Sequence, residues 1–339
     1  MDNTYLPSLA AVLLAAAPGS AAPPLSRYTF SEVHMGTRFK VIVYAADEAA
    51  ANRGAKAAFA RIAYLDATMS DYRPTSELMR LCKKAGGPPV KVSRELFFIL
   101  EKSREISERS GGAFDVTVGP VVRLWRRARK AKRLPDPEEL AAARALVGSK
   151  MMVLDKEHRT VKLLKPGMQL DLGGIAKGYA GDEAVKVLKE KGLPHCLVAG
   201  AGDIVAGDAP PGTAGWVVGI APLTDPEGKP KRYVLLKNSA VSTAGDAEQY
   251  VEIDGKRYSH VVDPKTGIGL VGRMTATVVA PNGLWSDPLT KVVAVLGPEK
   301  GFPIIEDTKG VSGYFVRKTE QGEESFASKR FPQVRQRDN

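Results

Sequence analysis

The chain of 339 residues is 44% hydrophobic and 26% charged, the composition of a soluble globular protein with enough apolar material for a core. This length allows one large domain or two modest ones. The net charge of +11 favours anionic ligands or surfaces. The two cysteines, Cys82 and Cys196, lie far apart and form no CxxC pair, so neither a disulfide framework nor a zinc site is indicated. We interpret both as buried thiols.

The N-terminus is the one candidate for a targeting segment. Residues 9–17 form an apolar run, and the small residues 19–22 after it are typical of a signal-cleavage site, although no lysine or arginine precedes the run. The run is too short to span a bilayer, and no cysteine follows it to carry a lipid anchor. We therefore expect residues 1–26 to be a signal-like or disordered leader of an exported, periplasmic or cell-surface protein, and residues 27–335 to form the folded domain.

The first half of the chain alternates strands and helices. Residues 39–44 predict a strand, and alanines with apolar residues at helical spacing predict a helix over 49–68. Three further helices follow from their start and stop residues. They are expected to begin after Ser93 and end at Gly111, to begin after Asp136 and end at Gly148, and to run from Ile175 to Lys191.

The second half is richer in strands, which are predicted at residues 216–220, 233–236 and 275–280. Asp254-Gly255 between two alternating runs is the strongest hairpin signal in the chain. Proline-rich loops are expected at residues 208–212 and 224–230. Interleaved helices and strands without a regular βαβ repeat favour an α+β fold.

The most informative segment is residues 170–180, which predict a strand end, a glycine turn and a helix start. Gly173 and Gly174 allow close approach of a ligand or a positive φ. Asp171 and Lys177 face the same opening, and the N-terminus of the following helix suits a phosphate group. The competing interpretation is an ordinary strand-to-helix turn with no ligand.

Two further segments carry candidate chemistry. Asp115 and Thr117 lie in a glycine-bracketed loop, residues 110–120. His260 stands at a strand end before a tight turn that Asp263 begins. His260 has the competing interpretation of a hydrogen-bonded polar core residue, and Asp263 that of a plain turn residue.

A third segment, residues 285–291, predicts a helix start with Asp287 as the N-cap and Pro288 as the first helical residue. A carboxylate and the Thr290 hydroxyl in one first turn can coordinate a hard cation such as Mg²⁺. The competing interpretation makes Asp287 a cap and nothing more.

Taken together, these segments resemble one family, the FAD:protein FMN transferases, also called ApbE-like flavin transferases. The match runs in unbroken order from residue 34 to residue 300, and it includes residues 69–77, which are similar to the family's MSxYxPxSE motif. The resemblance implies the ApbE-like α+β fold, two interleaved lobes with the flavin site between them.

The resemblance also implies an activity, partners and site residues. In such enzymes Mg²⁺ assists cleavage of the FAD pyrophosphate, FMN passes to a threonine or serine of a partner flavoprotein, and AMP leaves. We expect FAD and this acceptor as partners, no nucleic acid, and at most peripheral membrane contact. By resemblance, the residues that contact FAD are Met35, Tyr72, Ala113, Phe114, Asp115, Asp171, Lys177 and Val261, the metal ligands are Gly174 (through its carbonyl), Asp287 and Thr290, and the catalytic residues are His260, for proton transfer, and Asp287.

Other residues at the Tyr72 position accompany FAD hydrolysis in related proteins, so Tyr72 favours transfer. Several positions depart from the family's pattern. Lys291 stands where a metal-binding threonine is usual, and Ala244 replaces the serine of a TSG turn. A basic run, residues 123–133, replaces a glycine-rich segment. We interpret this run as a solvated surface, with docking of an acidic partner or a membrane surface as the sharper alternative.

Two alternatives to a Mg²⁺-dependent transferase stay open. The first is a flavin-binding relative with weak or metal-independent activity, which binds or hydrolyses FAD, and Lys291 motivates it. The second is a nicotinamide oxidoreductase, prompted by Gly200-Ala201-Gly202. It is disfavoured because no helix is predicted after these glycines to receive a pyrophosphate.

Overall fold

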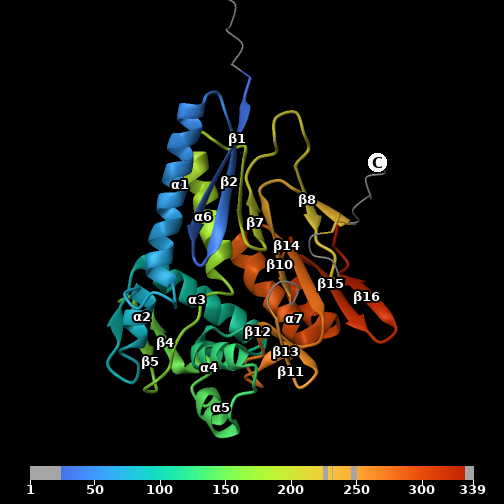
Figure 1. The fold of residues 1–339 in the computed structure, drawn as a ribbon. Coiled ribbons are helices and arrows are strands. Elements are labelled where there is room, and N and C mark those ends of the chain that lie inside the picture. Colours follow the sequence, from blue (N-terminus) through green and yellow to red (C-terminus); the bar gives the residue numbers. More distant parts are fainter. Residues whose placement is uncertain (1–23, 224–227, 231, 246–249, 333–339) are drawn as a thin grey trace, which may run out of the picture.

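The computed structural model describes residues 24–223, 228–230, 232–245 and 250–332 (Figure 1). The predicted leader, residues 1–26, therefore lies almost entirely outside the described residues. So do part of the predicted loop at 224–230 and the last residues of the predicted domain. Within the described ranges, no helix combines the length and the hydropathy that crossing a membrane requires.

The centre of the fold is an antiparallel sheet of eight strands in the order β1-β2-β6-β7-β10-β14-β15-β16. Its strands are β1 (Ser26–His34), β2 (Thr37–Ala45), β6 (Cys196–Gly200), β7 (Asp203–Ala206), β10 (Ser239–Gly245), β14 (Met274–Ala280), β15 (Ser312–Thr319) and β16 (Gly322–Ala327). The confirmed α+β class rests on this sheet and on the helices beside it.

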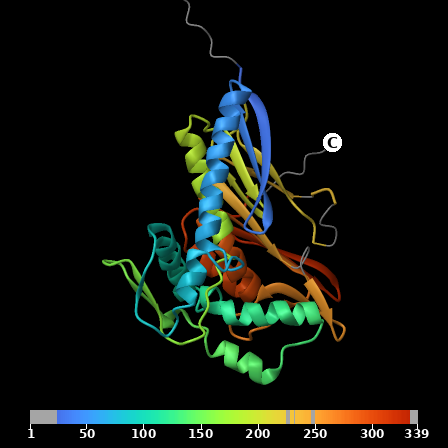
Figure 2. The same ribbon diagram turned by 60° about the vertical axis from the view of Figure 1, so that its left-hand side comes forward.

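Side-chain alternation along the strands gives the sheet two different faces. Val41 and Val43 point into the larger core with helices α1 (Glu48–Met69), α6 (Ala176–Glu190) and α7 (Gly283–Glu306). Ile42, between them, points into a second core. The short sheet of β8 (Trp216–Ile220) and β9 (Arg232–Leu236) covers that second core. Figure 2 shows α1, in blue, standing against the sheet.

A lower lobe lies beneath this sheet lobe in both views (Figures 1 and 2). It combines helices with two three-stranded sheets, β3-β5-β4 and β11-β12-β13. Its elements are α2 (Glu77–Cys82), β3 (Val90–Lys91), α3 (Arg94–Arg109), η1 (Val116–Val118), α4 (Gly119–Ala131), α5 (Pro137–Arg144), η2 (Ser149–Met151), β4 (Met152–Asp155), β5 (Thr160–Leu163), β11 (Tyr250–Ile253), β12 (Lys256–Val262) and β13 (Gly269–Val271).

Segments far apart in the sequence are interleaved in this lobe. Trp125 of α4 packs edge-on against Tyr258 of β12, with ring centres 5.6 Å apart, and its indole N–H donates to the Ser259 carbonyl over 3.1 Å. The α4 helix is thereby fixed to a hairpin that follows it by more than a hundred residues in the chain.

Most predicted elements are confirmed, including the strands and the hairpin, whose turn residues Asp254 and Gly255 have φ of 49° and 72°. The helix capped by Asp136 ends at Arg144, short of Gly148, and buries no residue.

The prediction that Asp287 is an N-cap is wrong. Helix α7 begins earlier, because Asn282 accepts a hydrogen bond from the Trp285 N–H over 3.2 Å and caps it. The carboxylate of Asp182 on α6 accepts from the N–H groups of Gly283 and Leu284 over 2.6 and 2.8 Å. These acceptors satisfy the exposed donors of the first turn, so Asp287 and Pro288 lie inside the helix.

The basic run is not simply a solvated surface. Residues 123–131 belong to α4, whose buried face consists of Val121, Leu124, Trp125 and Ala128. This face buries the helix against the lower lobe and turns Arg126 and Arg129 toward a cavity.

Candidate functional site

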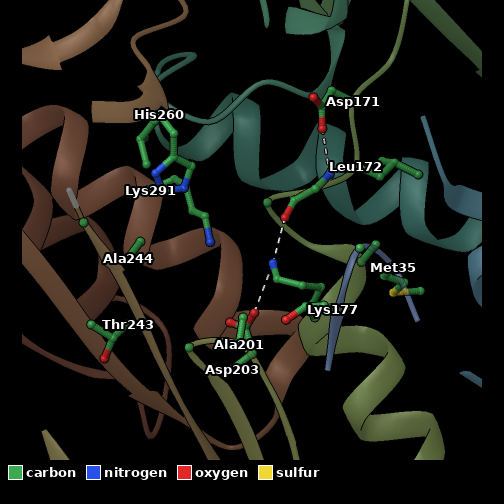
Figure 3. Close-up of a pocket in the computed structure, with 18 of the residues that line it drawn as sticks. Met35, Asp171, Leu172, Lys177, Ala201, Asp203, Thr243, Ala244, His260 and Lys291 are labelled. Atoms are coloured by element: carbon green, nitrogen blue, oxygen red, sulfur yellow. Dashed lines mark hydrogen bonds and ion pairs between the residues drawn. The ribbon is translucent and has the colours of Figure 1, made fainter. Parts of the chain in front are cut away.

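A cavity of about 820 Å³ lies where the sheet lobe meets the lower lobe. Figure 3 shows side chains from both lobes around it, among them Met35, Asp171, Lys177, His260 and Lys291. All eight residues predicted to contact FAD line the cavity: Met35, Tyr72, Ala113, Phe114, Asp115, Asp171, Lys177 and Val261. His260 and Gly174 line it as well, whereas Asp287 and Thr290 are fully buried behind its wall.

Met35 reaches the cavity from the turn between β1 and β2. Met35 and Gly36 have φ of 50° and 72°, the left-handed conformation of a two-residue hairpin turn. Residues other than glycine, asparagine, aspartate and histidine are uncommon in this conformation. The turn therefore holds Met35 at the cavity rim in a strained backbone conformation.

Asp171 is held by an arginine that sequence reasoning assigned to the surface. Arg126 Nη2 donates to Asp171 Oδ2 over 2.9 Å, and its Nη1 pairs with Asp71. Its guanidinium carbon lies 4.2 Å from the ring centre of Tyr72, which is 70% exposed. Burial and the nearby Asp71 carboxylate raise the pKa of Asp171 despite the opposing effect of Arg126.

Asp115 organises its own loop. Its Oδ1 accepts from the Thr117 N–H and hydroxyl over 2.8 and 2.6 Å, and its Oδ2 accepts from the Ser149 N–H over 2.8 Å. The carboxylate thereby caps η1 and ties it to η2. Its contribution to the cavity is to shape the wall that Ala113 and Phe114 complete.

Lys177 stands in the first turn of α6. Its Nζ lies 3.1 Å from Asp203 Oδ2, 3.0 Å from the Gly173 carbonyl oxygen and 3.9 Å from Asp287 Oδ2. Burial lowers the pKa of Lys177, but the carboxylates of Asp203 and Asp287 outweigh it, so the pKa is raised. Lys177 is therefore a permanent cation at the cavity.

The structure adds Asp203, which sequence reasoning missed. It follows Gly200-Ala201-Gly202, which forms a tight turn between the antiparallel strands β6 and β7. Gly202 is required because a Cβ there would lie 2.5 Å from the Thr243 carbonyl oxygen. No helix follows this turn directly, so the nicotinamide interpretation of these glycines loses its basis.

Gly173 and Gly174 have no positive φ, so close packing explains them. A Cβ at Gly174 would lie 3.3 Å from the Phe114 ring and 3.5 Å from Cε of Lys291. The lysine stem therefore runs beside the Gly174 backbone. Its Nζ donates to Asp287 Oδ1 and, over 3.1 Å, to the Asp287 carbonyl oxygen.

The three predicted metal positions do not fit a divalent cation as they stand. The second carboxylate oxygen of Asp287 accepts from the Gly178 N–H over 3.1 Å, and the Thr290 hydroxyl donates to the Asp287 carbonyl over 2.6 Å. Burial raises the pKa of Asp287, but the ammonium groups of Lys177 and Lys291 hold it below its usual value. Among the described residues, no three acidic, histidine or cysteine side chains gather closely enough for a metal ion.

His260 and Val261 come from β12, and both line the cavity. Figure 3 shows His260 on the opposite side of the cavity from Met35 of the β1–β2 turn. Val261 is buried and His260 half-buried. Arg129 lines the cavity too, and its Nε is buried without a hydrogen-bond acceptor among the described residues. A buried donor of this kind favours an anionic ligand in the cavity.

Comparison with known proteins shows which family this chain resembles. The model of the ApbE family matches residues 35–315. An FAD:protein FMN transferase of Klebsiella pneumoniae is 31% identical over 98% of this chain and 97% of its own length. One of Treponema pallidum is 34% identical over 85% of this chain and 84% of its own length.

Solved structures give the same result. The flavin transferase ApbE from Vibrio cholerae superposes with a TM-score of 0.81 at 27% identity, covering 90% of this chain and 98% of that one. The flavinyl transferase ApbE of Pseudomonas stutzeri, in its apo form, gives 0.79 at 30% identity, covering 91% and 97%.

Proposed function

The chain belongs to the ApbE family, and on that basis we propose that it transfers FMN from FAD to a threonine or serine hydroxyl of a partner flavoprotein, releasing AMP. The observation that carries this proposal is the gathering of all eight predicted FAD residues around one cavity. Its volume, about 820 Å³, is within the range of sites for large organic ligands.

The proposed reaction is a phosphoryl transfer. The acceptor hydroxyl oxygen attacks the phosphorus on the FMN side of the pyrophosphate, and the bond from that phosphorus to the bridging oxygen breaks. AMP leaves with the bridging oxygen, and the hydroxyl proton passes to the imidazole of His260, which suits a general base near neutral pH.

The remaining catalytic effect is positioning and electrostatic stabilisation. Lys177 and Lys291 put two ammonium groups at the cavity wall, and Arg129 offers its Nε, which has no hydrogen-bond partner among the described residues. At about 4 Å and an effective dielectric near 20, one such cation stabilises a phosphate charge by up to about 4 kcal/mol. Arg126 acts differently, because it orients Asp171 and stacks on Tyr72, the residue proposed to favour transfer over hydrolysis.

Magnesium at Gly174, Asp287 and Thr290 stays a prediction, and no step above depends on it. When bound, such an ion would neutralise part of the pyrophosphate charge.

The second candidate function, a flavin-binding relative with weak or metal-independent activity, is favoured by the contact of Lys291 with Asp287. Export through the leader also stays a prediction. It is tested by recovering the protein from outside the cytoplasm and sequencing its N-terminus.

The proposal is tested by incubating the purified protein with FAD and an acceptor domain that carries the target threonine and no flavin. The expected products are AMP, measured by chromatography, and a covalently fluorescent acceptor in a denaturing gel, in equal amounts. Release of AMP with free FMN and no labelled acceptor would replace transfer with hydrolysis. The absence of both products and of FAD binding would contradict the proposal.

A further inference from the structure

We propose that the ε-ammonium of Lys291 is the resident cation of this site and makes FAD cleavage independent of a divalent metal. This inference rests on the proposed function, since it names the group that neutralises pyrophosphate charge. It concerns a residue for which the family resemblance supplies no role, because the resemblance places a threonine at this position.

The first argument is the place of the ammonium. Lys291 Nζ donates to Asp287 Oδ1 and lies 3.1 Å from the Asp287 carbonyl oxygen. Its stem passes 3.5 Å from the place of a Cβ on Gly174. The ammonium therefore contacts one predicted metal ligand, Asp287, and its stem lies beside a second, Gly174.

The second argument is that the predicted protein ligands are already engaged. Mg²⁺ is usually held by one or two carboxylates, with waters and substrate phosphates completing its near-octahedral shell. The carboxylate of Asp287 already accepts from Lys291 and Gly178, and the Thr290 hydroxyl is turned to the Asp287 carbonyl. An incoming divalent ion would have to displace the Lys291 ammonium from the fully buried Asp287 carboxylate. The ion would then lie close to the displaced ammonium, which repels it.

The third argument is charge. Asp203 and Asp287 face Lys177 and Lys291, so two carboxylates and two ammonium groups balance one another. A divalent ion would leave this cluster with an excess of two positive charges in a largely buried place. With threonine at position 291, the same ion would leave an excess of one.

Lys291 can also reach a ligand. Its side chain is 18% exposed and lines the cavity. An ammonium has three N–H donors, and two are directed at Asp287 oxygens in the described structure. The third remains for a non-bridging phosphate oxygen of the pyrophosphate. One ammonium supplies half the charge of a divalent ion, so we expect slower turnover than in a metal-loaded threonine variant.

The test compares wild type with Lys291→Thr and Lys291→Arg. Lys300→Thr is the matched control, because Lys300 is exposed in α7 beyond the kink at Gly297. The first measurement is Mn²⁺ binding by electron paramagnetic resonance without FAD. We expect binding at least tenfold tighter in Lys291→Thr than in wild type, Lys291→Arg and Lys300→Thr.

The second measurement is AMP release from FAD in EDTA and in Mg²⁺. Wild type and Lys300→Thr should give equal rates in both, whereas Lys291→Thr should be inactive in EDTA and gain activity with Mg²⁺. Equal Mn²⁺ affinity in wild type and Lys291→Thr, or loss of wild-type activity in EDTA, would overturn the inference.

The two measurements separate this inference from the proposed function. If no protein cleaves FAD under any condition, the proposed function fails, while the Mn²⁺ comparison still decides where the resident cation lies. If Lys291→Thr does not fold, tight Mn²⁺ binding by wild type or by Lys291→Arg would contradict the inference, and its absence from both would support it.

Discussion

Arg126 and Asp171 meet across the boundary between α4 and the turn that begins α6, with 2.9 Å between Arg126 Nη2 and Asp171 Oδ2. The same guanidinium pairs with Asp71 and stacks on Tyr72. One side chain therefore connects three segments of the cavity wall. Removing it should loosen the wall and weaken FAD binding together.

We predict that Arg126→Ala lowers the free energy of unfolding by about 1 to 2 kcal/mol, since two charge-assisted hydrogen bonds are lost at a side chain that is about one third exposed. Urea unfolding measures this, and FAD titration should show weaker binding. Arg127→Ala is the control, because Arg127 is exposed and pairs with Glu139 on the surface. Equal losses in the two variants would contradict the assignment of Arg126.

His260→Ala is predicted to slow FMN transfer by about 10²- to 10⁴-fold, the usual contribution of a general base, while FAD still binds. The measurements are the transfer rate at saturating FAD and the FAD dissociation constant. His158→Ala, at an exposed turn between β4 and β5, should leave both unchanged. A normal transfer rate in His260→Ala would remove the histidine from the mechanism.

The approach of α6 to α7 positions Asp287 and tolerates no side chain at Gly178. A Cβ there would lie 2.2 Å from the Gly283 carbonyl oxygen and 2.8 Å from the Asp287 Cβ. Gly178→Ala should therefore destabilise the protein by about 3 kcal/mol or more, because backbone must move. Thermal unfolding checks this against Lys186→Ala on the exposed face of α6, which should be neutral. A neutral Gly178→Ala would mean that the helices are farther apart.

Both cysteines should be unreactive in the folded protein. Burial raises the pKa of Cys82 to about 11 and that of Cys196 to about 12, so at pH 8 only about one Cys82 in a thousand is a thiolate. Since these folded pKa values are raised, the stability from burying neutral thiols is complete below pH 9 and declines as the pH rises through 11 to 12. Ellman's reagent should label both thiols only after unfolding, and rapid labelling of native protein at pH 8 would contradict their burial.

The sequence predicted those turns and helix starts that depend on contacts between residues close in the chain. Asp254-Gly255 specified its hairpin, and the caps Ser93 and Asp136 are confirmed because each bonds to backbone within its own first turn. The start of α7 was mispredicted because its donors are satisfied partly by Asp182, from a helix a hundred residues earlier.

The basic run did contain a signal for a buried helix face. Val121, Leu124, Trp125 and Ala128 have the spacing of a buried helix face, but the basic residues between them suggested a solvated segment. The pairing of Arg126 with Asp171, and of Asp203 with Lys177, could not be predicted from spacing, because each depends on how distant elements pack. The predicted FAD residues came from family resemblance, and the fold gathers them around one cavity.

The most direct test of the central claim is the mass of an acceptor protein after incubation with FAD and this protein. Transfer predicts that the acceptor gains one FMN unit for each AMP released, and that Asp171→Ala, which we expect to stay folded by circular dichroism, yields neither product. An acceptor of unchanged mass, with wild type binding FAD and releasing AMP together with free FMN, would contradict transfer.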